Sequence, residues 1–198
     1  MSGPTREVEL KARVDDIESA RRSIETAGAL LVFEGSLRDR VYDTPARTLS
    51  AQDLVLRLRC YGSEGGTVAH LDWKGPTSRE NGFKIRAELT TEVSDPDALA
   101  RMLVRLGYEI VGSIDRDIVQ YELSNDRNQT VVLRFEIYPR MDTLVEIEGT
   151  PTRIEDAIRA LGIPRASFSA DRLADFVRAF ESRTGRRAAI CESQLDRE

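Results

Sequence analysis

The strand-like segments of this chain alternate strictly between charged and apolar residues, and this alternation limits the fold more than any other feature. Successive side chains of a β-strand point to opposite faces. Near the N-terminus Glu7, Glu9 and Lys11 therefore share one face, while Val8 and Leu10 share the other. The pattern recurs at residues 54–60, 70–74, 83–93 and 143–149. Several strands of one sheet are thus predicted to carry a face of charges of both signs.

Helix signals separate these strands. Capping residues and apolar stripes predict helices over residues 15–27, 95–107, 152–162 and 169–185. In the third, Thr152 and Glu155 have the spacing of a capping box. No repeat or linker divides the chain, so residues 1–185 are predicted to form a single, largely antiparallel α+β domain. Residues 186–198 have the composition of a flexible C-terminal tail.

Composition excludes several classes of protein. No apolar run reaches membrane length, and the N-terminus has no apolar core typical of a secretory signal. Cys60 and Cys191 are too few for a disulfide framework, which predicts a cytoplasmic protein. The net charge of −5 gives no reason to expect a nucleic-acid or membrane partner. His70 is the single histidine, which excludes a histidine-based metal site.

The charged faces allow two interpretations. They are either the solvated side of an antiparallel sheet or the lining of a closed barrel whose apolar exterior is covered by helices. Clustered long cations and carboxylates in i, i+2 pairs on two strands favour the barrel. A charged lumen is costly unless it is filled. A polyanion would pair with the cations, and the carboxylates would hold Mg²⁺ or Mn²⁺ through oxygen ligands.

A set of motifs resembles a known family. Glu7-Val-Glu9-Leu-Lys11 is similar to the E-x-E-x-K signature of the CYTH domain, the triphosphate tunnel metalloenzymes. Companion stretches follow in the family's order at residues 41–45, 56–59, 73–76, 84–88 and 146–148. The resemblance covers roughly residues 6–150. It implies an α+β fold with a closed eight-stranded, mostly antiparallel β-barrel, a polar lumen and flanking helices.

The resemblance also assigns roles to residues. It implies metal ligation by Glu7, Glu9, Glu146 and Glu148, with Glu136 standing where an aspartate is usual. It implies triphosphate contacts by Lys11, Arg57, Arg59, Lys74, Lys84, Arg86, Arg116 and Arg134. Lys11 and Glu88 are the predicted catalytic groups.

Besides Glu136, three positions depart from the family pattern. Ile118 stands where a cation is expected, and Arg134 is the candidate to replace it. Asp72 occupies the position of a threonine beside Lys74, and Thr90 stands where a carboxylate is common. These departures leave phosphate and metal binding intact as predictions but leave the reaction open.

Three functions remain as alternatives. Attack of the ribose 3′-hydroxyl on the α-phosphorus of ATP would yield cyclic AMP and pyrophosphate, as in class IV adenylyl cyclases, and the motifs favour this reaction. Attack of water on the terminal phosphorus would make the protein a triphosphatase for thiamine triphosphate, tripolyphosphate or a nucleotide. The cation missing at Ile118 motivates a third alternative, a non-catalytic triphosphate sensor. The family is often dimeric, so a homodimer is a further option.

Overall fold

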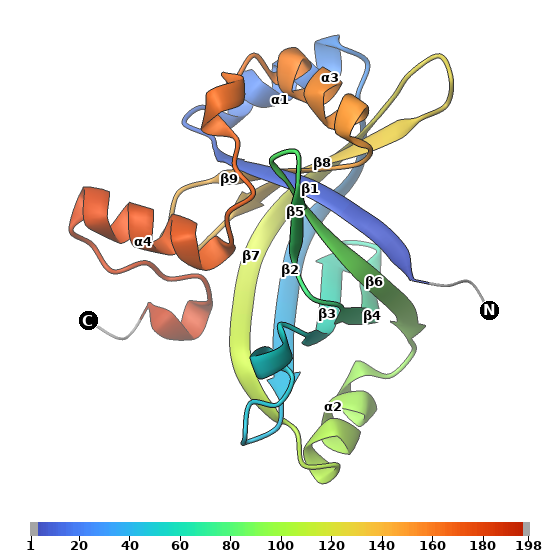
Figure 1. Ribbon diagram of the computed structural model, residues 1–198, viewed down its shortest axis with the longest axis vertical. Coiled ribbons are helices and arrows are strands. Elements are labelled where there is room, and N and C mark those ends of the chain that lie inside the picture. The colour runs from blue at the N-terminus through green and yellow to red at the C-terminus, as the bar shows by residue number, and fades with distance from the viewer. Residues whose placement is uncertain (1–3, 196–198) are drawn as a thin grey trace.

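The structure is a computed structural model that describes residues 4–195, in which nine strands form one antiparallel sheet (Figure 1). The strands are β1 (Thr5–Arg13), β2 (Leu30–Asp43), β3 (Val55–Ser63), β4 (Gly66–Lys74), β5 (Ser78–Glu80), β6 (Phe83–Val93), β7 (Glu109–Ser124), β8 (Thr130–Ile137) and β9 (Leu144–Glu148). Their order is β1-β9-β8-β7-β2-β3-β4-β6-β5, and β1 also pairs with β6. That last pairing closes eight strands into the predicted barrel, while β5 pairs with β6 outside the ring.

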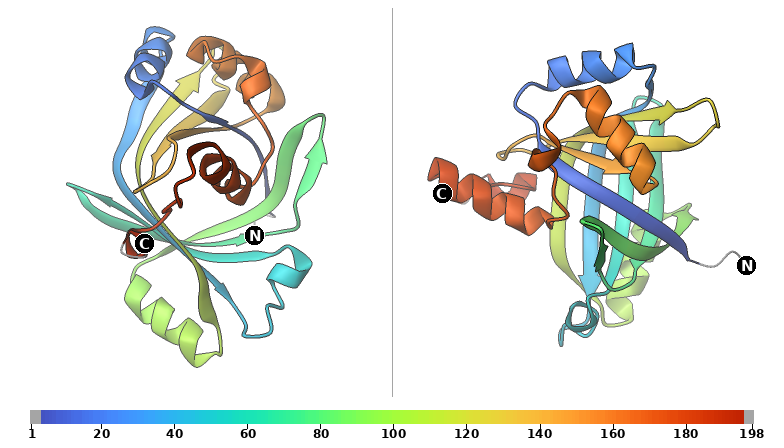
Figure 2. Two further views of the ribbon diagram at one scale, coloured as in Figure 1. Left: turned by 90° about the vertical axis from the view of Figure 1, so that its left-hand side faces the viewer. Right: turned by 45° about the horizontal axis from the view of Figure 1, so that its top comes forward.

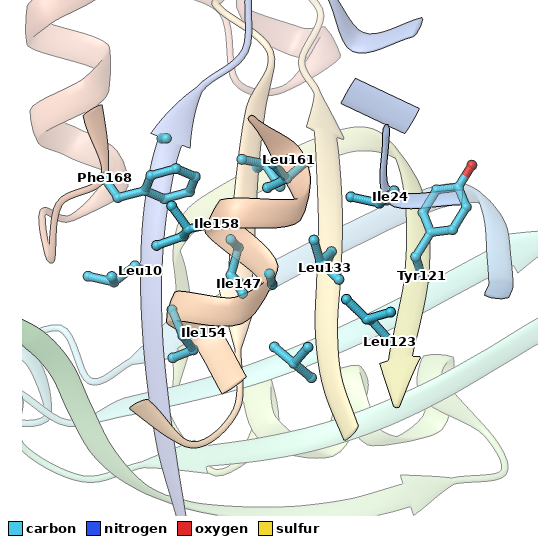
Figure 3. Packing of buried hydrophobic residues seen from close by; sticks show 14 of the residues in the cluster. Leu10, Ile24, Tyr121, Leu123, Leu133, Ile147, Ile154, Ile158, Leu161 and Phe168 are labelled. Carbon is cyan, nitrogen blue, oxygen red and sulfur yellow. The ribbon is translucent and has the colours of Figure 1, made fainter. Parts of the chain in front are cut away.

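The barrel is apolar outside and charged inside. Helices α1 (Ile17–Thr26) and α3 (Pro151–Leu161) cover the outer face of β1, β7, β8 and β9 (Figure 3). Leu10, Leu133 and Ile147 are fully buried beneath them. Helix α2 (Pro96–Arg105) packs with a smaller cluster that contains Leu58 and Leu103. The interpretation of the charged faces as a barrel lining is therefore confirmed.

The starts of α1 and α3 are set by different local signals. The side chain of Asp16 accepts a hydrogen bond from the Ser19 N–H and begins α1, as N-cap residues do. Helix α3 instead begins at Pro151 with Thr150 as its N-cap and without a side-chain cap. The predicted capping box of Thr152 and Glu155 is therefore wrong, because Thr152 already lies inside the helix, where the proline at its first position sets the start.

The last helix begins later than its sequence predicts. Helix α4 spans Leu173–Thr184 because Ser169 pairs with β1 instead: the Lys11 and Ser169 backbones exchange two hydrogen bonds of 2.9 Å. In the left view of Figure 2, α4 lies in front of the ring of strands. The connection from α3 contains the short helix η2 (Arg165–Ser167). This pairing with Lys11 fixes the start of α4 beside the interior of the barrel, which Leu173 lines.

The chain after Arg186 differs from its prediction as a flexible tail. Ala189 and Arg140 exchange backbone hydrogen bonds of 3.0 and 2.8 Å, and Asp115 donates its N–H to the Ile190 carbonyl. Ala188, Ala189 and Cys191 are buried. The segment contains η3 (Glu192–Gln194), and residues 196–198 lie outside the described part. Small and apolar side chains let residues 188–191 pack on β7, in contrast to the solvated tail that the sequence predicts.

None of the helices that the structure describes has the length and apolar character needed to cross a membrane.

Candidate functional site

One cavity of about 610 Å³ occupies the barrel, and the predicted site residues meet there. All of them line it: Glu7, Glu9, Lys11, Arg57, Arg59, Lys74, Lys84, Arg86, Glu88, Arg116, Arg134, Glu136, Glu146 and Glu148. The complete lining contains nine carboxylates and nine lysine or arginine side chains. The formal charges of the lining side chains therefore sum to zero before any ligand enters.

Strand register brings these side chains together. Glu9 lies across from Glu148, and Lys11 lies across from Glu146, in the pairing of β1 with β9. Arg134 on β8 is the partner of Glu146 on its other side. Side chains directly opposite one another on antiparallel strands are neighbours on the same face. The alternation that buries Leu10 outside the barrel thus also places charged groups side by side within it.

The carboxylates on β1, β8 and β9 form what we call the glutamate wall, which consists of Glu7, Glu9, Glu136, Glu146 and Glu148. Two of them bind lysines from other strands. Lys74 donates to both oxygens of Glu7 at 2.6 and 2.7 Å, and Lys84 donates to Glu9 at 2.6 Å. These charge-assisted bonds satisfy groups that would be costly if buried alone.

Lys11 joins two further carboxylates of the glutamate wall. Its ammonium donates to Glu136 at 3.1 Å and also to Glu146, which accepts a second bond from Arg134 at 2.7 Å. Burial would lower the pKa of Lys11, but Glu136 and Glu146 outweigh it and raise that pKa. Burial would likewise raise the pKa of Glu146, but Lys11 and Arg134 hold it well below its usual value. Both groups are therefore charged.

Glu148 differs from the rest of the glutamate wall. In the part of the chain that the structure describes it forms no ion pair. Burial, together with the charges of Glu7 and Glu146, raises the pKa of Glu148 to about 7. Burial and Glu146 also raise the pKa of Glu9. Carboxylates are crowded here beyond what the neighbouring cations neutralise, as happens where a site is built to receive positive charge.

The opposite side of the cavity, on β2, β3, β4 and β7, forms what we call the arginine wall: Arg57, Arg59 and Arg116 with the carboxylates Asp39 and Asp72. Arg59 donates two bonds to Asp39, at 2.8 and 3.0 Å, and Arg116 donates a third at 3.1 Å. Arg57 donates Nε and Nη2 to one oxygen of Asp72 at 2.9 and 2.6 Å. Arg116 also donates to Glu136 at 2.8 Å and so connects the two walls.

Two predicted residues have additional roles. Arg86 lines the cavity, yet its Nε donates to the Gly75 carbonyl and its Nη2 to the Asp53 carbonyl, both at 2.6 Å. It therefore ties together two loops at the cavity edge. Glu88 lies with one oxygen 3.3 Å from Lys74 Nζ and 3.8 Å from an Arg57 nitrogen, between the walls.

The departures from the motif pattern have structural counterparts. Ile118 is fully buried and lies across from Glu136 in the pairing of β7 with β8. Arg134 does line the cavity, but its Nε donates to Gln120, its partner two residue pairs further along the same strands. Asp72 accepts from Thr90 Oγ1 at 3.0 Å as well as from Arg57. Two of the substituted positions thus bind each other.

Sequence reasoning missed Asp39 and Tyr138. Asp39 is 0% exposed, and the Tyr138 hydroxyl donates to Glu136 at 2.8 Å. Both line the cavity. Asp39 was hidden because it lies between Arg38 and Arg40, so charges stand on both faces of β2 and the alternation disappears. Asp39 lies across from Arg59, which is twenty residues further along the chain. This pairing would have identified Asp39 as a cavity residue, but it is visible only once β2 is known to lie beside β3.

The glutamate wall fits a hard divalent cation in the type of its donors, since carboxylate oxygens are the ligands that Mg²⁺ and Mn²⁺ prefer. Within residues 4–195, however, no three acidic, histidine or cysteine side chains are already grouped as a metal site. Four of the five glutamates bind lysine or arginine instead. These ion pairs would open when a cation binds.

Comparison with known proteins supplies independent findings. A family model described as the CYTH domain matches residues 5–137. A putative adenylate cyclase from Vibrio parahaemolyticus superposes with a TM-score of 0.74 at 19% identity, covering 88% of this chain and 99% of that one. A protein from Pyrococcus horikoshii superposes with a TM-score of 0.69 at 23% identity, covering 87% and 98%.

A third structure is that of a putative adenylyl cyclase from Hippeastrum, described as having a dominant triphosphatase activity. It has a TM-score of 0.64 and 17% identity, with coverage of 87% and 96%. At these identities the likeness establishes a shared fold. A comparison with curated proteins finds no significant match.

Proposed function

Since the chain belongs to the CYTH family, we propose that it is a divalent-metal-dependent enzyme that binds an organic triphosphate in the barrel cavity. The first candidate reaction is that of an adenylyl cyclase, converting ATP to cyclic AMP and pyrophosphate. One observation carries the proposal: a glutamate wall faces an arginine wall within a single cavity in which nine carboxylates balance nine cations.

Charge balance indicates the form in which the substrate enters. A triphosphate alone would leave several uncompensated negative charges in a confined space, which is costly. A triphosphate accompanied by divalent cations preserves the balance. Each glutamate–lysine pair would then exchange partners, the glutamate holding the cation and the lysine donating to a phosphate oxygen. Lys11, Lys74 and Lys84 are the lysines released in this way.

Glu7, Glu9, Glu136, Glu146 and Glu148 would hold Mg²⁺ or Mn²⁺. When bound, such an ion neutralises charge on phosphate oxygens. The chain's own contribution is to bind and orient. Arg57, Arg59, Arg116 and Arg134 supply fork-like donors to phosphate oxygens, and lysines supply compact charges. Lys11 and Glu88 are the proposed catalytic groups, because both lie within the cavity among these donors.

The size and the partly apolar lining of the cavity favour an organic triphosphate. Its volume of about 610 Å³ falls in the range of sites for drug-sized molecules. Apolar side chains line part of it, namely those of Val41, Leu54, Val55, Ile114 and Leu173. These can contact a base or another organic group. In the cyclase reaction the ribose 3′-oxygen bonds to the α-phosphorus, the bond to the bridging oxygen breaks, and the 3′-hydroxyl proton leaves.

Hydrolysis of the terminal phosphate is the second candidate. It is supported by the likeness to the Hippeastrum protein, which carries a cyclase description and yet a dominant triphosphatase activity. The two reactions use the same phosphate and metal contacts and differ in whether the 3′-hydroxyl or water attacks. A dimer and a cytoplasmic location stay predictions from the sequence.

A product assay distinguishes the alternatives. The protein is incubated with ATP, thiamine triphosphate or tripolyphosphate, with Mg²⁺ and Mn²⁺ in turn, and products are separated by chromatography. Cyclic AMP with pyrophosphate would support the cyclase, while orthophosphate with a diphosphate product would support a triphosphatase. Binding without turnover would indicate a sensor, and absence of both binding and turnover would contradict the proposal.

A further inference from the structure

Asp39 has surroundings unlike those of the carboxylates on the glutamate wall. It lies on β2, directly across from Arg59 on β3, and is 0% exposed. Its two oxygens accept three bonds from Arg59 and Arg116, and a nitrogen of Arg57 lies 3.6 Å from Oδ2. Three guanidinium groups from two neighbouring strands thus surround one carboxylate.

This environment is unfavourable for a metal ion. Burial would raise the pKa of Asp39, but Arg59, Arg57 and Arg116 hold it well below its usual value. The local charge around Asp39 is positive, so a divalent cation would be repelled there. Both oxygens are already occupied by donors. Asp39 therefore stays with its arginines when the glutamate wall exchanges lysines for metal ions.

The arginines keep donors to spare. Arg59 uses Nε and Nη2 on Asp39, and its Nη1 lies 3.4 Å from the Tyr61 hydroxyl, which lines the cavity. Arginine side chains lose considerable rotamer entropy when they are fixed in one geometry. A buried counter-ion that has already fixed them removes that cost from substrate binding and keeps donors aligned as charge develops.

We propose that Asp39 is a positioning residue, which holds Arg59 and Arg116 as a rigid pair of phosphate donors without itself touching substrate or metal. The inference rests on the proposed function, in that it assumes a triphosphate as the ligand of the arginine wall. Asp72 holds Arg57 in a similar way from β4, through two bonds to one oxygen. Asp39 is the stronger case because it joins arginines from two strands.

Removing the charge of Asp39 should separate affinity from turnover. In Asp39→Asn the cavity gains one unit of net positive charge, so a polyanion is bound at least as tightly. The guanidinium groups lose their common acceptor, so their alignment with the transition state relaxes and kcat falls. We expect a decrease in kcat of about tenfold or more with an unchanged or smaller Kd for tripolyphosphate. A purely structural defect would lower active-site occupancy and turnover together.

Asp43→Asn is the matched control. Asp43 lies on the same strand and is 1% exposed, yet it accepts hydrogen bonds from the backbone of Thr44, Leu49 and Ser50 and contacts no arginine in the described chain. Both variants are compared with the wild type in kcat for the best substrate of the product assay. Calorimetric titration with tripolyphosphate gives Kd, and thermal unfolding reports the folded fraction. The control should leave kcat and Kd per folded molecule unchanged.

Asp39→Glu covers the case in which Asp39→Asn does not fold. It retains the charge but moves it by one methylene, so Kd should match the wild type while kcat is reduced. Unchanged kcat in both Asp39 variants would overturn the inference. A parallel loss of kcat and of tripolyphosphate affinity would also overturn it, as would a decrease in kcat in Asp43→Asn equal to that in Asp39→Asn. Failure of the wild type to bind tripolyphosphate or turn over any substrate would instead overturn the proposed function.

Discussion

The two walls of the cavity use opposite charges in different ways. On the glutamate wall the partners are mostly lysines, which are compact charges on flexible stems. On the arginine wall each aspartate accepts two or more bonds from planar guanidinium groups. The first arrangement can separate when a metal ion and a phosphate arrive together. We expect the second to be more rigid, because each aspartate is bound by forked donors. On this proposal one balanced cavity contains both exchangeable and fixed ion pairs.

Removing two glutamates should disrupt the exchangeable side most severely. Glu7→Gln with Glu9→Gln preserves side-chain volume but deletes two proposed metal ligands, so metal-dependent turnover should fall by about a thousandfold or more. Circular dichroism should show an intact fold. Steady-state turnover under Mg²⁺ and Mn²⁺ is the measurement, and wild-type rates in the double variant would remove these residues from the site.

A substitution on the outer face of the same strands tests whether stability of the core and ligand binding by the glutamate wall are independent. Ile147 is 0% exposed and lies between Glu146 and Glu148 in sequence. Ile147→Ala should lower the free energy of unfolding by about 2–5 kcal/mol through a cavity in the core. Below its unfolding temperature the variant should bind tripolyphosphate within about twofold of the wild type. Urea unfolding and calorimetry measure the two quantities, and a large loss of affinity would show that packing outside the barrel sets the geometry inside.

Arg57→Ala examines the arginine wall directly. The variant removes a forked donor, so the affinity for a triphosphate should fall by about tenfold, the value of a charge-assisted hydrogen bond. A monophosphate, which spans less of the cavity, should lose less. Titration of both ligands against wild type and variant provides the test. Equal losses for the two ligands would place Arg57 outside the phosphate contacts.

The smallest expected effect concerns Asp43, whose carboxylate accepts hydrogen bonds from neutral donors and not from arginines. Burial would raise the pKa of Asp43, but hydrogen bonds from Ser50 and Leu49 lower it to about 2. Because the folded pKa lies below the unfolded value of about 4, Asp43 stabilises the fold above pH 4. This contribution is lost as the pH falls from about 4 towards 2.

Urea midpoints measured from pH 6 to pH 2 for the wild type and Asp43→Asn test this sign. The variant should be less stable than the wild type near neutral pH, and the difference should shrink on acidification. A difference that does not depend on pH would show that the loop after β2 does not depend on the Asp43 charge.

Much of the fold and site was accessible from the sequence where alternation is clean. On β1 the period of two separates Glu7, Glu9 and Lys11 from Val8 and Leu10, so the faces could be assigned from the residues alone. Strand β2 was not predicted, because Arg38, Asp39 and Arg40 carry charge on both faces. Arg38 is exposed outside the barrel, whereas Asp39 is buried inside it.

The sequence by itself determined which side chains share a face, because that property is local and repeats every second residue. Only the tertiary structure decided which charges neutralise one another. Glu7 pairs with Lys74 and Lys11 with Glu136 across many residues of sequence. Those partners depend on the closure of β1 against β6 and on the register of β8 with β9. The pairing of the charges on the glutamate wall and the arginine wall therefore arises from barrel closure, which no single segment encodes.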